Sequence, residues 1–161
     1  EMLKLVDEYP RYQFVVAATN TFSKEYYQSF IKGKNLALVF DETYGLLSNA
    51  KAAVVTSGTA SLEAALFKVP QVVCYKTNWI TYILAKNLIK IKFLSLVNIL
   101  MDKLVVKELI QADFNKINIK EELDILLNER ERLLTDYDKL SDLLNKKGAS
   151  KNAAQVIISS F

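Results

Sequence analysis

A run of hydroxyl-bearing, glycine and acidic residues stands where an apolar, strand-like segment passes directly into a helical one. Residues 56–65 read TSGTASLEAA. Gly58 permits a tight turn and a close approach of a ligand to the main chain. The free N–H groups at the start of the helix, with the hydroxyls of Ser57 and Thr59, then form a site for an anion such as a phosphate. In an open parallel sheet, ligands bind at this position, beyond the carboxyl end of a strand.

Glu63 adds a carboxylate to this motif. It follows Thr59 by four residues, so both side chains project from one face of the helix about a turn apart. A carboxylate one turn behind a phosphate site is placed to accept hydrogen bonds from the two ribose hydroxyls of a nucleotide. The motif therefore favours a nucleotide site. The alternative is that Ser57 and Thr59 only cap the helix and that Glu63 is a solvated surface acid.

The composition excludes several other chemistries. Histidine is absent, which removes Ser-His-Asp and Cys-His catalysis and nearly every zinc site. Cys74 is the single cysteine, so there is no internal disulfide, and its apolar strand predicts a buried structural thiol. Ser57 lacks the G-x-S-x-G frame, and no Walker lysine follows Gly58. We therefore expect neither a metal nor a cofactor.

The charge is concentrated in one segment. The net charge of +3 is too small to indicate nucleic acid, and we expect no such partner. Residues 76–107 hold six lysines against one acid, for +5. Lys86, Lys90 and Lys92 lie within or at the end of this segment's predicted helix. One interpretation is an ordinary helix whose lysines are solvated while their stems cover apolar surface. The other is a face that binds an anionic membrane surface.

The pattern of apolar segments predicts a parallel α/β fold. Short apolar runs that do not alternate with polar residues are typical of strands buried on both faces, and their starts recur at the spacing of βαβ units. The predicted strands are 12–18, 36–40, 52–56 and 71–75. Helices are predicted at 1–9, 23–32, 42–49, 58–68, 78–92 and 119–147, with a last helix after Gly148. The last helix carries Ile157, Ile158 and Phe161, and an exposed stripe of this kind favours a homodimer or swapping.

Several motifs in a fixed order resemble one family. The segment VTSGTASLEAALFKVPQVVCYK at 55–76 is similar to the central motif of lipid-A-disaccharide synthases, which are inverting glycosyltransferases of family 19 with a GT-B fold. SLVNIL at 95–100, VKELIQ at 106–111 and the start of the last helix at 148–154 continue the likeness. Val97 stands where the family usually has proline, and Lys76 where it has arginine. Lysine keeps the charge but loses the two-pronged geometry of arginine.

The resemblance implies a domain organisation and a donor site. Residues 1–118 would be the Rossmann-like nucleotide-sugar-binding domain of a GT-B enzyme, with its first strand upstream, and 119–161 C-terminal helices that pack on it or on a partner. The helix that begins at the Ser-Gly-Thr motif would hold the diphosphate, and further contacts would come from Tyr75 and Lys76 after their strand and from Asn98 in an irregular segment. The implied UDP-sugar-binding residues are Ser57, Gly58, Thr59, Glu63, Tyr75, Lys76 and Asn98.

The resemblance also implies an activity for the complete protein. It would transfer 2,3-diacylglucosamine from UDP-2,3-diacylglucosamine to 2,3-diacylglucosamine 1-phosphate. No catalytic residue is expected in this chain, because the acceptor site and the catalytic acid would lie in an N-terminal domain that precedes it, so the chain alone should be inactive. The implied location is cytoplasmic, peripheral on the inner face of the inner membrane of a Gram-negative bacterium.

Two other functions remain open at this point. One is another UDP-sugar enzyme of the same fold, such as an epimerase or a peptidoglycan glycosyltransferase. The other is a nucleotide-binding or assembly module without catalytic activity.

Overall fold

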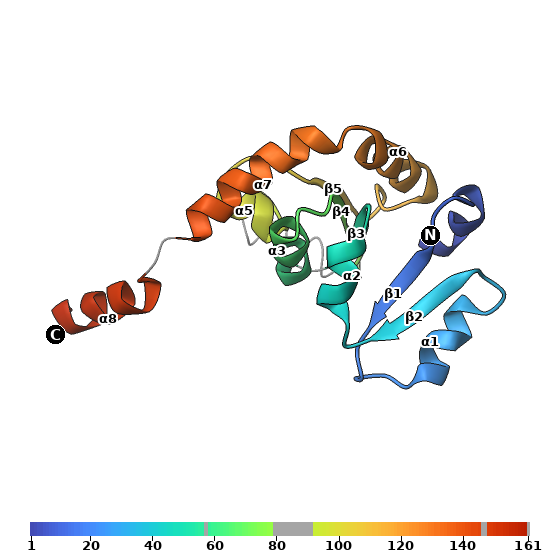
Figure 1. Cartoon of the computed structure of the whole chain (residues 1–161), viewed down its shortest axis with the longest axis horizontal. Helices are drawn as coiled ribbons and strands as arrows, with labels where there is room; N and C mark the ends of the chain where they lie inside the picture. The colour runs from blue at the N-terminus through green and yellow to red at the C-terminus, as the bar shows by residue number, and fades with distance from the viewer. Residues whose placement is uncertain (57, 79–91, 146–147, 161) are drawn as a thin grey trace.

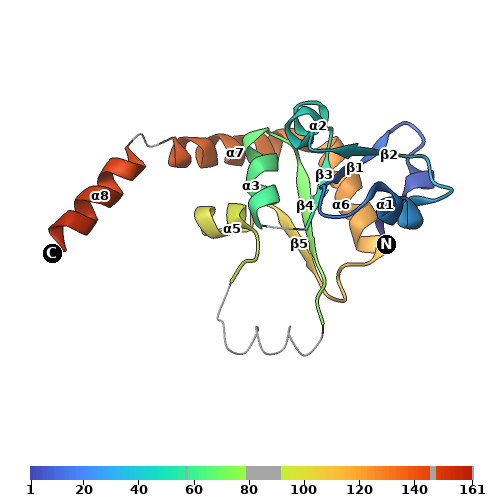
Figure 2. The same cartoon turned by 90° about the horizontal axis from the view of Figure 1, so that it is seen from below.

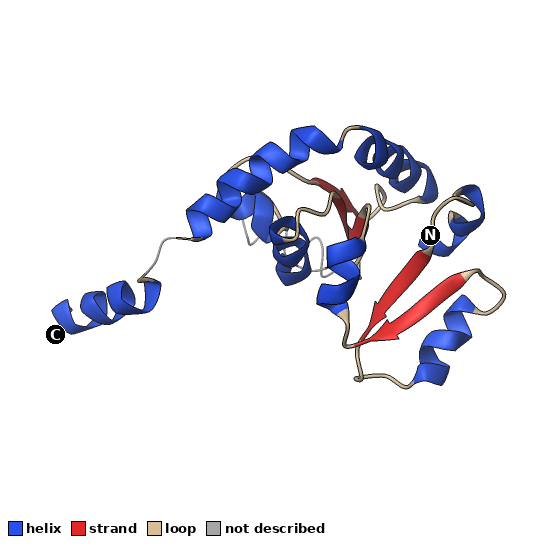
Figure 3. Cartoon of the chain, in the orientation of Figure 1, coloured by secondary structure: helices blue, strands red, loops and turns tan. Residues whose placement is uncertain are grey.

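The computed structural model describes residues 1–56, 58–78, 92–145 and 148–160. It is an α/β fold with parallel strands and flanking helices, which confirms the predicted fold class (Figures 1 and 3). The strands are β1 (Phe14–Ala18), β2 (Leu36–Phe40), β3 (Ala53–Val55), β4 (Gln71–Tyr75) and β5 (Lys107–Ile110). The helices are α1 (Lys24–Ile31), α2 (Thr43–Asn49), α3 (Gly58–Leu66), α5 (Leu96–Met101), α6 (Lys116–Asn128), α7 (Arg130–Leu144) and α8 (Ala149–Ser159).

The strands form two parallel sheets. β1 pairs with β2, with Phe14 opposite Leu36, and β3, β4 and β5 form a second sheet in that order. Figure 2 shows β4 and β5 running down the view while β2 runs across it. Within the part of the chain that the structure describes, β1 pairs only with β2, and β3 pairs only with β4. Each of these two strands therefore has one edge without a neighbouring strand.

The central strand β4 is buried on both faces. Val72 and Cys74 point into one apolar cluster together with residues of α6, whereas Val73 points into a second cluster together with Tyr137 and Leu140 of α7. Successive side chains of a strand face opposite sides of the sheet, so a strand covered on both sides needs a continuous apolar sequence. Figure 2 shows α3 and α5 on one side of β4 and β5, with α6 on the other.

The first sheet has packing of its own. Tyr27 of α1 contacts Phe40 of β2, with the ring centroids 5.7 Å apart, and its hydroxyl lies 3.2 Å from the main-chain nitrogen of Thr19. Ser23 begins α1 because its hydroxyl accepts a hydrogen bond from the main-chain N–H of Tyr26. These contacts hold α1 against the β1–β2 pair.

Two helix predictions differ from the structure. Residues 1–9 form two short 3₁₀ turns, Met2–Lys4 and Val6–Glu8, rather than the end of an α-helix. The predicted helix 119–147 is divided at Glu129 into α6 and α7. The division has a packing reason: α6 contributes to the cluster on one face of the sheet and α7 to the cluster on the other, so the chain must turn around the sheet between them.

Other differences concern the segment after β4. Both β5 and α5 lie where no regular element was predicted. The predicted helix 78–92 falls almost entirely outside the described residues, and so do Lys86 and Lys90. Among the described residues, no helix is both long enough and apolar enough to cross a membrane.

The last helix, α8, stands away from the rest of the molecule (Figures 1 and 2). Val156, Ile157 and Ile158 are 59% to 74% exposed. Phe161, which was predicted to share their stripe, lies outside the described residues. The helix thus presents an uncovered apolar face, as the sequence predicted for Ile157 and Ile158.

Candidate functional site

The start of α3 is the centre of the candidate site. The helix begins at Gly58, two residues after Thr56 and three after the end of β3, so the predicted passage from strand to helix is confirmed. Thr59 is exposed in the first turn of α3. Ser57 lies outside the described residues. The N–H groups of Gly58 and Thr59 precede the first acceptors within the helix, so these two groups can bind an anion.

Gly58 allows a close contact between α3 and α5. A Cβ atom at Gly58 would lie 3.2 Å from Cγ of Leu96 and 3.9 Å from the main-chain oxygen of Leu94. The side chain of Leu96 therefore occupies the space beside Gly58. A close approach was predicted at this glycine, and the structure shows one made by a residue of the same chain.

Glu63 lies one turn after Thr59, in the half-buried part of α3. Within the described ranges, its carboxylate has neither a hydrogen-bond nor an ion-pair partner. Its spacing from the start of α3 is that of the predicted ribose contact. The carboxylate can accept two hydrogen bonds from a diol, whereas the first turn of α3 offers donors, so the two groups complement a ribose and a phosphate respectively.

Tyr75 and Lys76 follow at the carboxyl end of β4, where both are exposed. The main-chain oxygen of Tyr75 accepts a hydrogen bond from Gln111, at 2.9 Å. The Gln111 side chain also accepts from the N–H of Thr77, at 2.8 Å, and donates to its carbonyl, at 3.1 Å. Gln111 thus holds the chain where it leaves β4.

Asn98 lies in α5 rather than in an irregular segment, and its side chain is completely buried. Its Oδ1 accepts from the N–H groups of Val105 and Val106, at 2.8 and 2.9 Å. Its Nδ2 donates to the carbonyl of Val106 and to Oε1 of Glu108, both at 2.8 Å. These four bonds use the whole hydrogen-bonding capacity of the amide and join α5 to β5. The predicted contact of Asn98 with a nucleotide stays a prediction.

Glu108 is a residue that the sequence did not single out. Besides its bond to Asn98, its carboxylate accepts hydrogen bonds from the main-chain N–H groups of Leu94 and Ser95. Ser95 in turn caps α5, because its hydroxyl accepts from the N–H of Asn98. The only signal in the sequence is a lone acid within the otherwise apolar and basic segment VVKELI.

The structure therefore brings several of the predicted residues together. The start of α3 touches the segment 94–96, which Glu108 and Asn98 connect to β5. Tyr75 and Lys76 lie at the end of the neighbouring strand β4, which is linked to β5 through Gln111. Within the described residues, no hydrogen bond or ion pair joins Tyr75 or Lys76 to Glu63.

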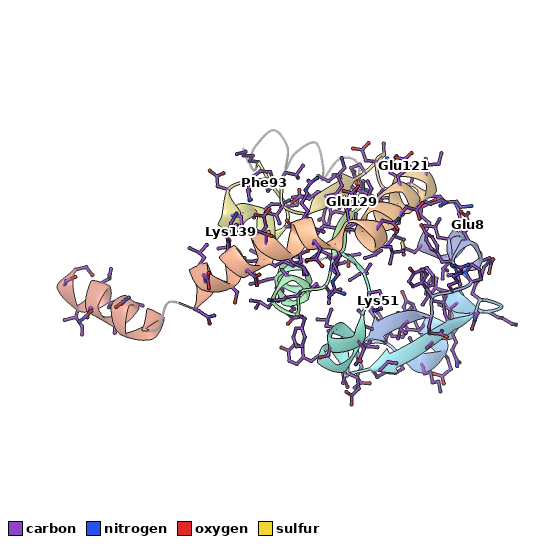
Figure 4. The ribbon with its side chains drawn as sticks, turned by 45° about the horizontal axis from the view of Figure 1, so that its top comes forward. Glu8, Lys51, Phe93, Glu121, Glu129 and Lys139 are labelled. Carbon is purple, nitrogen blue, oxygen red and sulfur yellow. The ribbon has the colours of Figure 1, made fainter. Side chains whose placement is uncertain are left out.

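Near this region, one lysine is paired with an acid and the thiol is buried. Lys103 forms an ion pair of 2.6 Å with Asp136 of α7. Cys74 is buried, as predicted, and burial raises the pKa of its thiol to about 12. Among the residues that the structure describes, there is no group of three or more Cys, Asp or Glu side chains that could hold a metal ion. Figure 4 shows Glu121 and Glu129 on the outer surface near α6, away from α5.

Comparisons with known proteins agree with this architecture. The family model described as lipid-A-disaccharide synthetase (LpxB) matches residues 1–160. A lipid-A-disaccharide synthase of Psychromonas ingrahamii is 36% identical over 156 residues, which cover 94% of this chain and 41% of that protein. A lipid-A-disaccharide synthase of Pasteurella multocida is 36% identical over 165 residues, which cover 96% of this chain and 42% of that protein. Lipid-A-disaccharide synthase 1 of Legionella pneumophila is 30% identical over 154 residues, which cover 92% of this chain and 40% of that protein.

These comparisons confirm the resemblance inferred from the sequence motifs. The chain spans about two fifths of the length of the curated relatives it matches. Its parallel sheets and flanking helices are consistent with a Rossmann-like half of the family's GT-B fold. Because the family model covers residues 1–160, the chain belongs to the lipid-A-disaccharide synthetase family.

Proposed function

We propose that this chain is the donor-binding half of a lipid-A-disaccharide synthase, an inverting hexosyltransferase of lipid A biosynthesis. The complete protein would transfer 2,3-diacylglucosamine from UDP to 2,3-diacylglucosamine 1-phosphate and release UDP. The observation that carries this proposal is the family match over residues 1–160 together with the α3 start beside β3.

The chemistry proposed for the site is electrostatic. The first turn of α3, with Gly58, Thr59 and the hydroxyl of Ser57, would hold the diphosphate and stabilise the negative charge that develops as UDP departs. Glu63 would accept hydrogen bonds from the ribose hydroxyls. Lys76, which is exposed after β4, would add positive charge near the phosphates.

Tyr75 and Asn98 complete the proposed site. Tyr75 is exposed at the end of β4, so its ring and hydroxyl are accessible to a ligand. Asn98 is completely buried and uses all four of its hydrogen bonds within the chain, so it would serve the site by holding α5 against β5. No step of this proposal needs a metal or another cofactor.

The rest of the protein would supply what this chain lacks. We assign residues 1–118 to the nucleotide-sugar-binding domain and 119–161 to helices that pack on it or on a partner. Among the residues that the structure describes, β1 and β3 each have one edge without a neighbouring strand, and these edges support a further strand between the two sheets, contributed by another part of the protein. The acceptor site and the catalytic acid would belong to the N-terminal domain, so the 161-residue chain should bind UDP weakly and transfer no sugar.

Two association properties are part of the proposal. The acylated substrates favour a peripheral position on the cytoplasmic face of the inner membrane, with the lysines of 76–107 toward anionic lipid. Of these, Lys92 lies over the ring of Phe93, 4.9 Å from its centroid, and Phe93 is labelled in Figure 4. The exposed face of α8, with Ile157 and Ile158, supports a homodimer.

Calorimetric titration with UDP and with inorganic pyrophosphate tests the donor site. Glu63→Gln should weaken UDP binding about ten- to a hundredfold and leave pyrophosphate binding unchanged, because only UDP carries the ribose hydroxyls. Thr59→Pro should weaken both ligands, since proline removes one N–H from the first turn of α3 and is tolerated there.

Two variants serve as matched controls. Glu121→Gln changes an exposed glutamate of α6, and Thr43→Pro places proline at the first residue of α2. Neither should alter the affinity for UDP. If Glu63→Gln and Thr59→Pro both bind UDP as well as the parent chain does, the motif at 57–63 is a helix cap and the proposed site is wrong.

A further inference from the structure

One carboxylate oxygen of Glu108 accepts hydrogen bonds from three donors in the segment 94–98. Its Oε1 accepts hydrogen bonds from the main-chain N–H of Leu94 at 3.1 Å, from that of Ser95 at 2.9 Å and from Nδ2 of Asn98 at 2.8 Å. Its Oε2 accepts only from Leu94, at 3.0 Å. Glu108 belongs to β5, which pairs with the buried strand β4, so the carboxylate ties residues 94–98 to the sheet.

The segment held in this way lies directly against the start of α3. Cγ of Leu96 would be 3.2 Å from a Cβ atom at Gly58, and the carbonyl oxygen of Leu94 would be 3.9 Å from it. Leu96 therefore fills the space that a side chain at Gly58 would need, and α3 can approach α5 this closely only because residue 58 is a glycine. A displacement of Leu94 or Leu96 changes the surface beside Gly58.

We propose that Glu108 is a positioning residue: it fixes Leu94–Leu96 and thereby sets the place and direction of the N–H groups that open α3. The inference rests on the proposed function, because those N–H groups matter only if they bind the diphosphate. Glu108 does not touch the ligand in this proposal. Its effect passes through Leu96 and Gly58.

Two substitutions at Glu108 separate the effect of its hydrogen bonds from the effect of its charge. All three donors reach Oε1, so a glutamine whose carbonyl oxygen takes that place keeps a hydrogen bond to each of them and loses only the second contact of Leu94, the one of 3.0 Å to Oε2. An alanine loses every one of them. Glu108→Gln should therefore preserve the position of α3, and Glu108→Ala should not.

The experiment measures the affinity of the 161-residue chain for UDP and for inorganic pyrophosphate by calorimetry. Glu108→Ala should weaken both ligands by the same factor, about tenfold, because the diphosphate site itself is displaced. Glu108→Gln should bind both within about twofold of the parent chain. The pattern differs from that of Glu63→Gln, which should affect UDP alone. Circular dichroism establishes that each variant is folded at the temperature of the titration.

A second variant covers the case in which Glu108→Ala does not fold. Leu96→Ala leaves the hydrogen bonds of Glu108 in place and removes the side chain beside Gly58, so it should also weaken both ligands equally. Glu121→Ala, an exposed change on α6, is the control for both substitutions.

Each outcome has one meaning. Suppose that the parent chain binds UDP. If Glu108→Ala or Leu96→Ala, once shown to be folded, then binds both ligands as tightly as the parent chain does, Glu108 does not position α3 and the inference alone is wrong. A Glu108→Gln variant as weak as Glu108→Ala also overturns it. If the parent chain binds neither ligand, the proposed function fails, and this inference fails with it.

Discussion

Replacing Asn98 by alanine should destabilise the chain more than almost any other single polar change. The substitution leaves the N–H groups of Val105 and Val106 without their acceptor and removes two further bonds, to Val106 and Glu108. A buried polar group without a partner costs about 1–3 kcal/mol. Two such groups, with the small cavity that is left, give a loss of about 3–5 kcal/mol from a domain stability of about 5–15 kcal/mol.

An aspartate at position 98 keeps part of the hydrogen bonding and adds a charge, so it tests the two effects separately. In Asn98→Asp, one carboxyl oxygen still accepts from Val105 and Val106, but the other faces the carbonyl of Val106 and the carboxylate of Glu108. Burial and these acceptors raise the pKa of the introduced carboxyl group in the folded chain. The folded state then binds more protons than the unfolded state, so the free energy of unfolding falls as pH rises. The deficit of the variant against wild type should be smaller near about pH 4.5 than near about pH 8.

Urea unfolding followed by circular dichroism at these two pH values measures both effects. Asn145→Ala is the control, because Asn145 is exposed after α7 and its amide lies 3.4 Å from the hydroxyl of Ser141. It should cost less than about 0.5 kcal/mol. A cost below about 1 kcal/mol for Asn98→Ala, or a deficit of Asn98→Asp that grows toward acid pH, would refute the reasoning.

Two further predictions concern the thiol and the last helix. Cys74 should react with iodoacetamide at pH 8 only when the chain unfolds. Burial raises the pKa of its thiol to about 12, so the folded state holds almost no thiolate. Rapid labelling of the folded protein would contradict this. Changing Ile157 and Ile158 together to serine should convert the proposed dimer into a monomer in light scattering, since both side chains are exposed on α8. A mass equal to that of the parent chain would contradict this.

The sequence predicted those elements whose side-chain pattern is decided locally. The three residues of β4 that enter the apolar clusters, Val72, Val73 and Cys74, are all apolar. The hydroxyl of Ser23 caps α1, which begins at the next residue. β5 escaped prediction because Lys107 and Glu108 make up half of its four residues. Its place in the sheet comes from pairing with β4, which is a contact between residues distant in the sequence.

The site was predictable in part for the same reason. The turn from strand to helix at Gly58 and the spacing of Glu63 are local features, and the structure has both. The burial of Asn98 is not local, because an asparagine is usually exposed and this one is satisfied by main-chain groups of Val105 and Val106 in the next connection. The role of Leu96 beside Gly58 also depends on how α5 packs on α3.

The division of the strands into two sheets has a consequence for how stability is distributed along the chain. The β1–α1–β2 unit has its own ring contact between Tyr27 and Phe40, and it reaches the main core chiefly through Phe14. Opening residues 14–40 disrupts few buried contacts, whereas separating β4 from β5 breaks both apolar clusters. Local unfolding therefore costs less free energy in the first unit than in the second, and backbone amides of β1 and β2 exchange with solvent at rates set by that smaller cost. We therefore expect the β1–α1–β2 unit and the β3–β4–β5 sheet to open as separate cooperative units.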